Sequence, residues 1–304
     1  MNSTSNPPTI DALTYTTVID LHVHSDESDG SWRPARLVEE AVALGLEALA
    51  ITDHDTFNGF ELAREPARAA GLDLVCGIEI STRLIREDRP AIQDVHVLGY
   101  FLKQPPPAGI LRWLEALQAS RNDRNTRLAL RLQSLGLEVK LEEAQALGRT
   151  LTGRPHFAKV LVEKGYAASI RDAFERYLDE SGSAYVPRRE PSFAEAVAII
   201  TASGGLPVLA HPYKLADKCP EGLEDLIADL VEQGLRGIEV YHSEHSPAGI
   251  SQYLAVARAH GLVITGGSDF HGDAKPGVEL GRGREGRLHV PREVLERLRA
   301  SVRH

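Results

Sequence analysis

Short apolar runs alternate along the chain with segments in which apolar residues recur every three or four positions. Seven runs of β-branched or apolar residues end in polar side chains, which predicts buried strands. These runs are residues 18–24, 48–53, 74–79, 95–100, 207–211, 238–242 and 263–269. Helical spacing lies between most of them, in residues 34–44, 58–70, 192–203, 222–233 and 247–260. We expect Pro66 to interrupt the second helix.

The segment from residue 103 to 189 breaks this alternation. It opens with three consecutive prolines, which form a stiff linker, and continues as an almost wholly helical pattern. We expect an inserted helical subdomain here, a main domain made of residues 18–102 and 190–304, and a flexible tail over residues 1–17. Strand–helix alternation in the main domain predicts an α/β fold with a parallel sheet covered by helices.

Histidines and carboxylates gather where the predicted strands end. His22 and His24 are two positions apart, so they point to the same side of their strand. A lone histidine at a strand end is usually a hydrogen-bonded polar residue. Six of the twelve histidines, together with acids, at the end that forms the catalytic face of α/β barrels favour one shared site. The candidate metal ligands are His22, His24, Asp29, His54, Glu79, His96, His211, Asp269 and His271.

The donor types indicate the metal and the reaction. Imidazoles and carboxylates without thiolates suit Mn, Zn or Fe ions. Nine ligands are too many for one ion and, with Glu79 as a bridge, suggest two or three divalent ions. Such clusters lower the pKa of bound water and stabilise the charge of a displacement at phosphorus, which predicts hydrolysis of a phosphate ester.

Six segments carry these residues, in the order DLHVHSDESDG, ITDHD, GIEIS, HVLGY, AHP and GSDFH. This ordered set, from about Val18 to Gly283, resembles the motifs of the PHP (polymerase and histidinol phosphatase) family. The resemblance implies a distorted, TIM-like (β/α)7 barrel, similar to that of amidohydrolases, with a trinuclear site in which Mn is favoured. It implies three ligand sets: His22, His24, Glu79 and Asp269; Glu79, His96 and His211; and Asp29, His54 and His271. Asp26 is a rival to Asp29, which the HSxxSDG spacing selects.

The helical insertion resembles that of 3′,5′-nucleotide bisphosphate phosphatases, a subgroup also described as 5′-to-3′ exoribonucleases of 5′-phosphorylated RNA. The resemblance rests on TGRPHFA and AYVP. The guanidinium of Arg154 suits a distal phosphate, and His156 can donate a further hydrogen bond. A helix cap with exposed charges is the alternative for this pair. Tyr185 can stack on a base or simply pack, and Lys214 is a weaker candidate for contact with a phosphate.

The net charge of −9 argues against a polyanionic partner, but residues 103–189 carry +5 and the remainder −14. A positive insertion suits a phosphorylated substrate, although helical insertions also collect surface arginines. Cys76 and Cys219 are far apart, which makes a disulfide framework improbable and a reducing compartment the default. Without a signal-like start or a long apolar run, we expect a cytoplasmic protein that does not contact membranes.

Together these features predict a metal-dependent phosphoesterase that removes the 5′-phosphate of a nucleoside 3′,5′-bisphosphate, such as adenosine 3′,5′-bisphosphate, or acts on short 5′-phosphorylated RNA. Asp269, which holds the proton of the attacking water, and His211 are the expected catalytic residues. No obligate protein partner is expected. The alternatives are a phosphatase of histidinol phosphate, an amidohydrolase acting on C–N bonds, and a non-catalytic module like the barrel attached to some polymerases.

Overall fold

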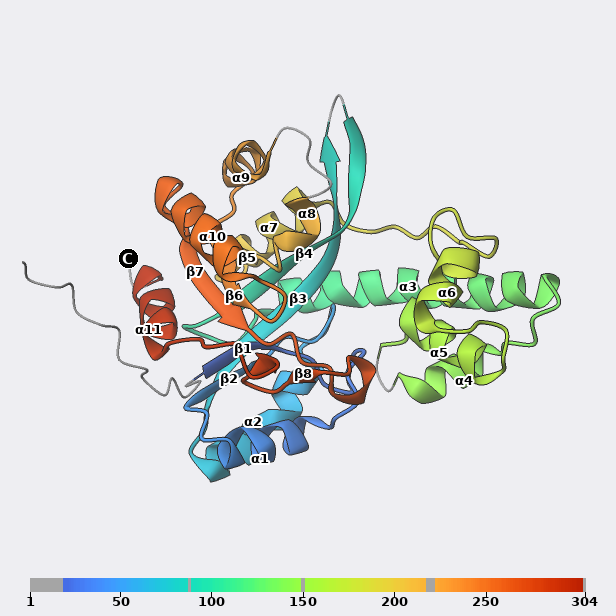
Figure 1. Cartoon of the computed structure of the whole chain (residues 1–304), viewed down its shortest axis with the longest axis horizontal. Coiled ribbons are helices and arrows are strands. Elements are labelled where there is room, and N and C mark those ends of the chain that lie inside the picture. Colours follow the sequence, from blue (N-terminus) through green and yellow to red (C-terminus); the bar gives the residue numbers. More distant parts are fainter. Residues whose placement is uncertain (1–18, 87–88, 149–150, 217–221, 303–304) are drawn as a thin grey trace, which may run out of the picture.

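A computed structural model describes residues 19–86, 89–148, 151–216 and 222–302 (Figure 1). Its centre is a seven-stranded sheet in which the spatial order of the strands follows the sequence. The strands are β1 (Ile19–Val23), β2 (Ala48–Ile51), β3 (Asp73–Arg86), β4 (Arg89–Phe101), β5 (Leu206–Leu209), β6 (Gly237–His242) and β7 (Val263–Gly267). The expected tail over residues 1–17 and Cys219 lie outside the described residues, and Cys76 is a buried free thiol.

The direction of β4 differs from the prediction. This strand is antiparallel to both β3 and β5, whereas every other neighbouring pair in the seven-stranded sheet is parallel. Only residues 87 and 88 separate β3 from β4, which is too few for a crossover helix, so the chain returns as a hairpin. The prediction of a parallel sheet is therefore wrong at β4, and the long hairpin projects from the sheet in Figure 1.

The first and last strands come together and nearly close the sheet into a barrel. The amide of Asp269 donates to the carbonyl of His22 at 2.8 Å, and that of His24 donates to the carbonyl of Phe270 at 2.9 Å. Gly267 permits this approach, because a Cβ atom there would lie 2.3 Å from the His22 nitrogen. The expected α/β barrel is thus confirmed.

Seven helices among the described residues accompany the sheet. They are α1 (Pro34–Ala43), α2 (Asn58–Ala70), α7 (Phe193–Ala202), α8 (Tyr213–Ala216), α9 (Leu223–Glu232), α10 (Pro247–Ala259) and α11 (Arg292–Ser301). In α1 the apolar stripe of Leu37, Val38 and Ala41 is buried, as its spacing predicts. The expected interruption at Pro66 is wrong, since α2 continues through it. Pro66 follows the exposed Leu62 by one turn, so the proline lies toward the solvent side of α2.

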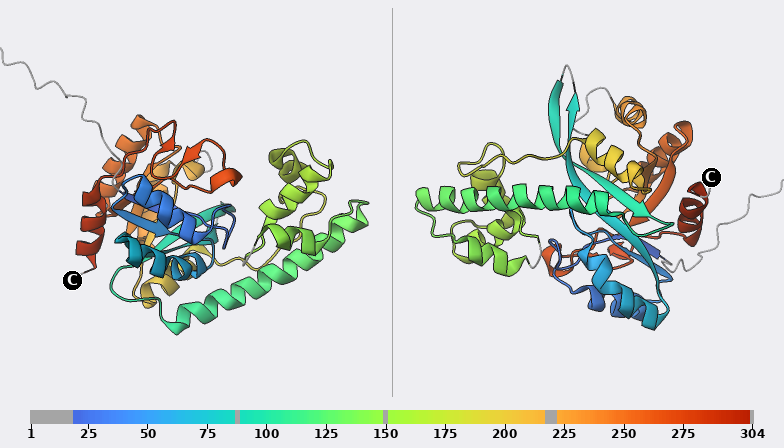
Figure 2. Two further views of the ribbon diagram at one scale, coloured as in Figure 1. Left: turned by 90° about the horizontal axis from the view of Figure 1, so that it is seen from below. Right: turned by 180° about the vertical axis from the view of Figure 1, so that it is seen from behind.

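The insertion is built on one long helix that leaves the barrel (Figures 1 and 2). Its elements are α3 (Ala108–Ser134), α4 (Leu141–Leu147), α5 (Arg154–Glu163), α6 (Ile170–Ala173) and the π-helix η1 (Phe174–Leu178). The first half of α3 packs through Ile110 and Leu114 on the barrel core, and the second half packs through Leu128 and Leu132 in a separate hydrophobic cluster. The two regions therefore share α3, and the boundaries at residues 103 and 189 stay predictions.

Three short elements complete the described chain after β7. They are the 3-10 helix η2 (Gly272–Ala274) and the strands β8 (Val278–Glu279) and β9 (Gly283–Arg284). The two strands pair with each other in a small antiparallel sheet of their own. None of the described helices combines the length and the apolar composition that a membrane span requires.

Candidate metal centre and the adjoining cavity

The nine predicted ligands converge at one end of the barrel. His22 and His24 point to the same side of β1, as their spacing predicts, and their Nε2 atoms lie 3.2 Å apart. Both side chains are fully buried. His211 follows β5 and Asp269 follows β7, each in a backbone conformation with positive φ, 28° and 55° respectively. Such conformations are costly for residues other than glycine and concentrate at functional sites, where the surrounding structure holds them.

His96 reaches the same end of the barrel although its strand runs in the opposite direction. It lies within β4 and pairs with Ser81 of β3, two residues beyond Glu79. Because β3 continues past the point where its parallel neighbours end, the hairpin partner of that extension lies above the barrel end. His96 therefore joins the cluster through the length of β3 and not through a carboxyl-terminal strand end.

Glu79 is the centre of the cluster. Its Oε1 lies 2.8 Å from both His96 Nδ1 and His211 Nε2, and its Oε2 lies 3.0 Å from His24 Nε2 and 3.3 Å from His22 Nε2. Burial alone would raise the pKa of Glu79, but neighbouring imidazoles, with His96 the strongest, hold it well below its usual value. A buried carboxylate whose two oxygens face different histidines has the geometry of a bridging ligand.

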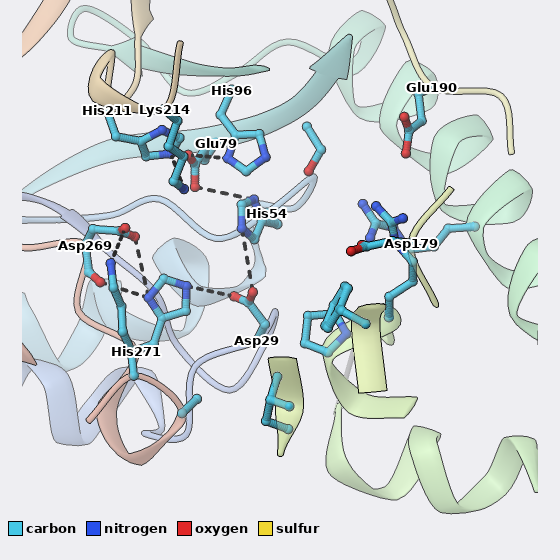
Figure 3. A pocket seen from close by; sticks show the side chains of 18 of the residues that line it. Asp29, His54, Glu79, His96, Asp179, Glu190, His211, Lys214, Asp269 and His271 are labelled. Atoms are coloured by element: carbon cyan, nitrogen blue, oxygen red, sulfur yellow. Dashed lines mark hydrogen bonds and ion pairs between the residues drawn. The ribbon is translucent and has the colours of Figure 1, made fainter. Parts of the chain in front are cut away.

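Asp29 organises the outer part of the cluster. Its carboxylate lies 3.3 Å from His271 Nε2, 3.6 Å from His24 Nδ1 and 3.7 Å from His54 Nε2. Figure 3 shows Asp29, His54 and His271 converging at the edge of the cavity. The Nδ1 of His24 is buried and makes no hydrogen bond within the described part of the chain, as expected of a nitrogen that faces a ligand.

The donor atoms form four overlapping groups in which all atoms lie within 4.8 Å of one another. The groups are His24, Asp29, His54 and His271; His22, Glu79 and His211; His22, His24 and Asp269; and His54, Glu79 and His96. Mixed imidazole and carboxylate donors at this spacing fit divalent ions such as Mn, Fe or Zn. The nine residues can therefore hold a metal cluster, while the assignment of each ligand to one ion stays a prediction.

Two buried acids that sequence reasoning missed support this cluster. Glu239 in β6 accepts from His22 Nδ1 at 2.9 Å and from the His211 amide at 2.8 Å, which directs the His22 Nε2 toward the cluster. Asp20 accepts from the amide and hydroxyl of Ser268, just before Asp269. The available signal was a carboxylate inside a strand that is otherwise mostly apolar. His242, left out of the predicted ligand set, lies 3.3 Å from Asp269 Oδ2.

A cavity of about 620 Å³ joins the cluster to the insertion. Figure 3 shows the cluster on one side, with Asp179 and Glu190 across the open space. The insertion contributes a basic wall and a small apolar surface. The basic residues are Arg121, Arg124, Arg154, Lys159 and Arg188, and the apolar ones include Ile170 and Phe174. This volume lies in the range of small-molecule sites.

The structure places the four predicted substrate-binding residues differently. Arg154 lines the cavity on the insertion side, and Lys214 lines it on the barrel side, with Nζ 3.4 Å from His211 Nε2. Tyr185 lines a second cavity that adjoins the first. His156 lines neither of these two cavities.

His156 has a structural position instead. Its side chain is buried, and Nδ1 accepts from the Gly153 amide at 2.9 Å, at the start of α5. This satisfies an amide at the helix N-terminus, so the cap that was the alternative to a phosphate contact describes its position. His156 Nδ1 is thus occupied by the helix start, and contact of His156 with a phosphate stays a prediction.

Arg121 and Arg124 of the basic wall were also missed. Arg121 pairs with the buried Asp55, and Gln118 Nε2 donates to the Asp55 carbonyl at 3.0 Å, which fixes α3 beside the loop that carries His54. Both arginines occupy positions where the buried stripe of α3 would continue from Leu117 to Leu128. A cation inside an apolar stripe was the signal that could have found them, since buried arginines normally have an anionic partner.

Comparisons with known proteins place the chain in a family and identify similar proteins that act on phosphate esters. The family model described as PHP domain matches residues 20–186. The chain is 38% identical to the 5′-3′ exoribonuclease Rnm of Escherichia coli, over 88% of this chain and 89% of that protein. It is 37% identical to the phosphoribosyl 1,2-cyclic phosphate 1,2-diphosphodiesterase of Eggerthella lenta, with coverage of 83% and 94%. It is 31% identical to the 3′,5′-nucleoside bisphosphate phosphatase of Chromobacterium violaceum, with coverage of 86% and 90%.

Two solved structures are similar over nearly the whole chain. One is described as a metal-dependent phosphoesterase from Bifidobacterium adolescentis, with a TM-score of 0.75, 31% identity, and coverage of 92% of this chain and 94% of that chain. The other is described as an amidohydrolase from Chromobacterium violaceum, with a TM-score of 0.76, 28% identity, and coverage of 94% and 96%.

Proposed function

Because this chain is a metal-dependent phosphoesterase of the PHP domain family, we propose that its substrates are nucleoside 3′,5′-bisphosphates and short 5′-phosphorylated RNA. One observation carries the proposal. The metal-ligand cluster and a wall of arginines face each other across one cavity, so a substrate with two phosphates can place one at each side. The apolar side chains of Ile170 and Phe174 line the same cavity and suit a nucleoside.

The names of two relatives bear on which bond breaks. An exoribonuclease that works from the 5′ end cleaves on the 3′ side of the terminal nucleotide. A bisphosphate phosphatase with the same site attacks the same position if it removes the 3′-phosphate. We therefore propose that the 3′-side phosphate lies at the metal cluster and the 5′-phosphate at the arginines. This replaces the 5′-phosphate cleavage expected from the sequence.

The residues divide the chemistry between them. When bound, divalent ions supply an activated water at neutral pH and positive charge beside the reacting phosphoryl group. Asp269, whose Oδ2 also accepts from Lys275 Nζ at 2.6 Å, takes the proton of the attacking water. His211 orients Glu79, and Lys214 contacts the reacting phosphate. Arg154 holds the 5′-phosphate and thereby positions the 3′-side phosphorus.

The metal is proposed to be Mn, with Fe and Zn as competitors for the same donors. Metal-free protein should be reconstituted with each ion separately, and both the bound stoichiometry and the turnover measured. We expect two or three ions per chain and the highest turnover with Mn. A single bound ion at full activity would contradict the shared cluster.

A kinetic screen tests the substrate. We expect kcat/KM for a nucleoside 3′,5′-bisphosphate to exceed that for a nucleoside 3′-monophosphate by about tenfold or more, because a charged hydrogen bond to the second phosphate is added. The released products should be inorganic phosphate and the nucleoside 5′-monophosphate. Release of the nucleoside 3′-monophosphate instead would restore the bond expected from the sequence.

The same screen includes the competing functions. Histidinol phosphate tests the monophosphatase alternative, and a ribose 1,2-cyclic phosphate bearing a 5-phosphate tests the activity that the Eggerthella lenta relative's name describes. Higher kcat/KM on either compound than on the bisphosphate would overturn the proposed substrate class. Absence of hydrolysis across the whole panel by metal-loaded protein would support the non-catalytic alternative.

A further inference from the structure

A second cavity of about 330 Å³ adjoins the first at the basic wall. Arg124, Arg154 and Arg188 line both cavities, as do Asp179 and Glu190. The residues that line the second cavity alone are Glu180, Ser181, Tyr185 and Val186. The three arginines are therefore a shared wall, open to one space on the side of the metal cluster and to another on the far side.

The shared wall is built to receive an anion. The side chain of Arg188 is 5% exposed, and its Nη1 is buried without a hydrogen-bond partner in the described structure. Burial, and then the guanidiniums of Arg121, Arg188 and Arg154, lower the pKa of Arg124, which shows the repulsion that these cations exert on one another. Glu190 offsets part of this repulsion, because its Oε1 accepts a hydrogen bond from Arg188 Nε at 3.0 Å. A phosphate between the arginines would relieve the remainder.

The far side of the wall suits a nucleoside better than further phosphates. Among the described residues that line only the second cavity there is no lysine or arginine, while Glu180 adds a carboxylate. Tyr185 is half-buried, and its hydroxyl donates to Glu180 Oε1 at 3.3 Å, which fixes the ring at the cavity wall. An aromatic ring held in this way is a platform on which a base can stack without regard to its identity.

We infer that the second cavity binds a nucleoside esterified to the 5′-phosphate, so that the non-reacting phosphate at the arginines is accepted as a diester. The inference rests on the proposed function. A substrate with a terminal 5′-phosphate contacts the arginines from the first cavity alone. In a diester, the nucleoside on the other side of that phosphate lies in the second cavity, beside Tyr185. The protein then acts one nucleotide inside an RNA end as well as at the end.

Three substrates that lose the same 3′-phosphate test this inference with metal-loaded protein. They are a nucleoside 3′,5′-bisphosphate, the same nucleoside 3′-phosphate with a 5′-methylphosphate diester, and the diribonucleotide 3′-phosphate that carries an upstream nucleoside in place of the methyl group. The two diesters have equal charge at the arginines and differ only in the base and sugar. We expect kcat/KM for the diribonucleotide to exceed that for the methyl diester by about fivefold or more.

Variants of Tyr185 test whether this side chain causes the preference for the diribonucleotide over the methyl diester. Tyr185→Ala should reduce the ratio of the two diester kcat/KM values to within about twofold of unity, and Tyr185→Phe, which keeps the ring, should preserve it. A ratio near unity in the unmodified protein, or one that Tyr185→Ala leaves unchanged, would overturn the inference. Hydrolysis of the bisphosphate in that case would leave the proposed function intact, whereas no hydrolysis of any of the three would reject both.

Discussion

The barrel end and the insertion line the same cavity with opposite charge and by different structural means. At the barrel end, carboxylates such as Glu79 and Asp269 lie among imidazoles and are fixed by strands and by hydrogen bonds from neighbouring buried groups. On the insertion side, the guanidinium of Arg124 is buried beside other arginines, which lower its pKa. We propose from this difference that the first region binds cations and performs the reaction, and that the second selects the substrate. Substitutions should therefore affect the two properties separately.

The largest effect is expected from loss of a barrel ligand. His22→Ala or Asp269→Ala should lower kcat by about 1,000-fold or more on every phosphate ester, because several kcal/mol of transition-state stabilisation by bound metal is lost. Chelation should abolish activity in the same uniform way. Steady-state kinetics with metal analysis measures both, and His260→Ala at the end of α10 is the matched histidine control. Near-full turnover of either ligand variant would contradict the role of the barrel end.

A smaller loss of metal affinity, equal in its effect on every substrate, is expected when a residue that holds a metal ligand in place is substituted. Glu239→Gln removes the charge that holds His22 Nδ1 and should weaken metal affinity by about 10- to 100-fold. Metal titrations followed by activity should show a shifted midpoint and recovery of most turnover at saturating metal. The ratio of activities on different substrates should stay constant, and a change in that ratio would mean that Glu239 contributes to selectivity.

A selective effect is expected on the insertion side. Arg154→Ala should lower kcat/KM for a nucleoside 3′,5′-bisphosphate by about tenfold, since a charged hydrogen bond to the second phosphate is lost. A nucleoside 3′-monophosphate lacks that phosphate, so its kcat/KM should change by less than about threefold. Arg112→Ala, an exposed arginine of the same basic insertion on α3, serves as the control. Equal losses on both substrates would refute the division between the two regions.

The smallest effect is expected at His156, whose Nδ1 accepts a hydrogen bond from the Gly153 amide at the start of α5. His156→Ala removes the acceptor for the Gly153 amide and should lower the free energy of unfolding by about 1 kcal/mol. His156→Asn retains an acceptor and should recover part of that loss. Urea unfolding measures the stability, and the ratio of bisphosphate to monophosphate kcat/KM should be the same in both variants. A selective fall in bisphosphate hydrolysis would support His156 as a phosphate contact.

Sequence predictions succeeded for features that depend on residues close together in the chain, and they failed for features that depend on contacts between distant segments. The spacing of His22 and His24 predicted their shared direction because alternation along a strand is local. The strands and helices of the barrel were likewise visible from apolar periodicity. The reversal of β4 was missed, since a long apolar strand reads the same in either direction. Arg121 and Arg124 were missed because their burial depends on where α3 packs.

The sequence by itself determined most of the elements, the chemical types of the donors, and the shared direction of His22 and His24, because these depend on residues close together in the chain. Only the tertiary structure decided that Glu79 faces several histidines and that Glu239 directs His22. It likewise decided that His156 lines neither cavity and that three arginines line both. Contacts between distant segments depend on how strands and helices pack, and a difference of one helical turn or one strand direction changes which side chains meet.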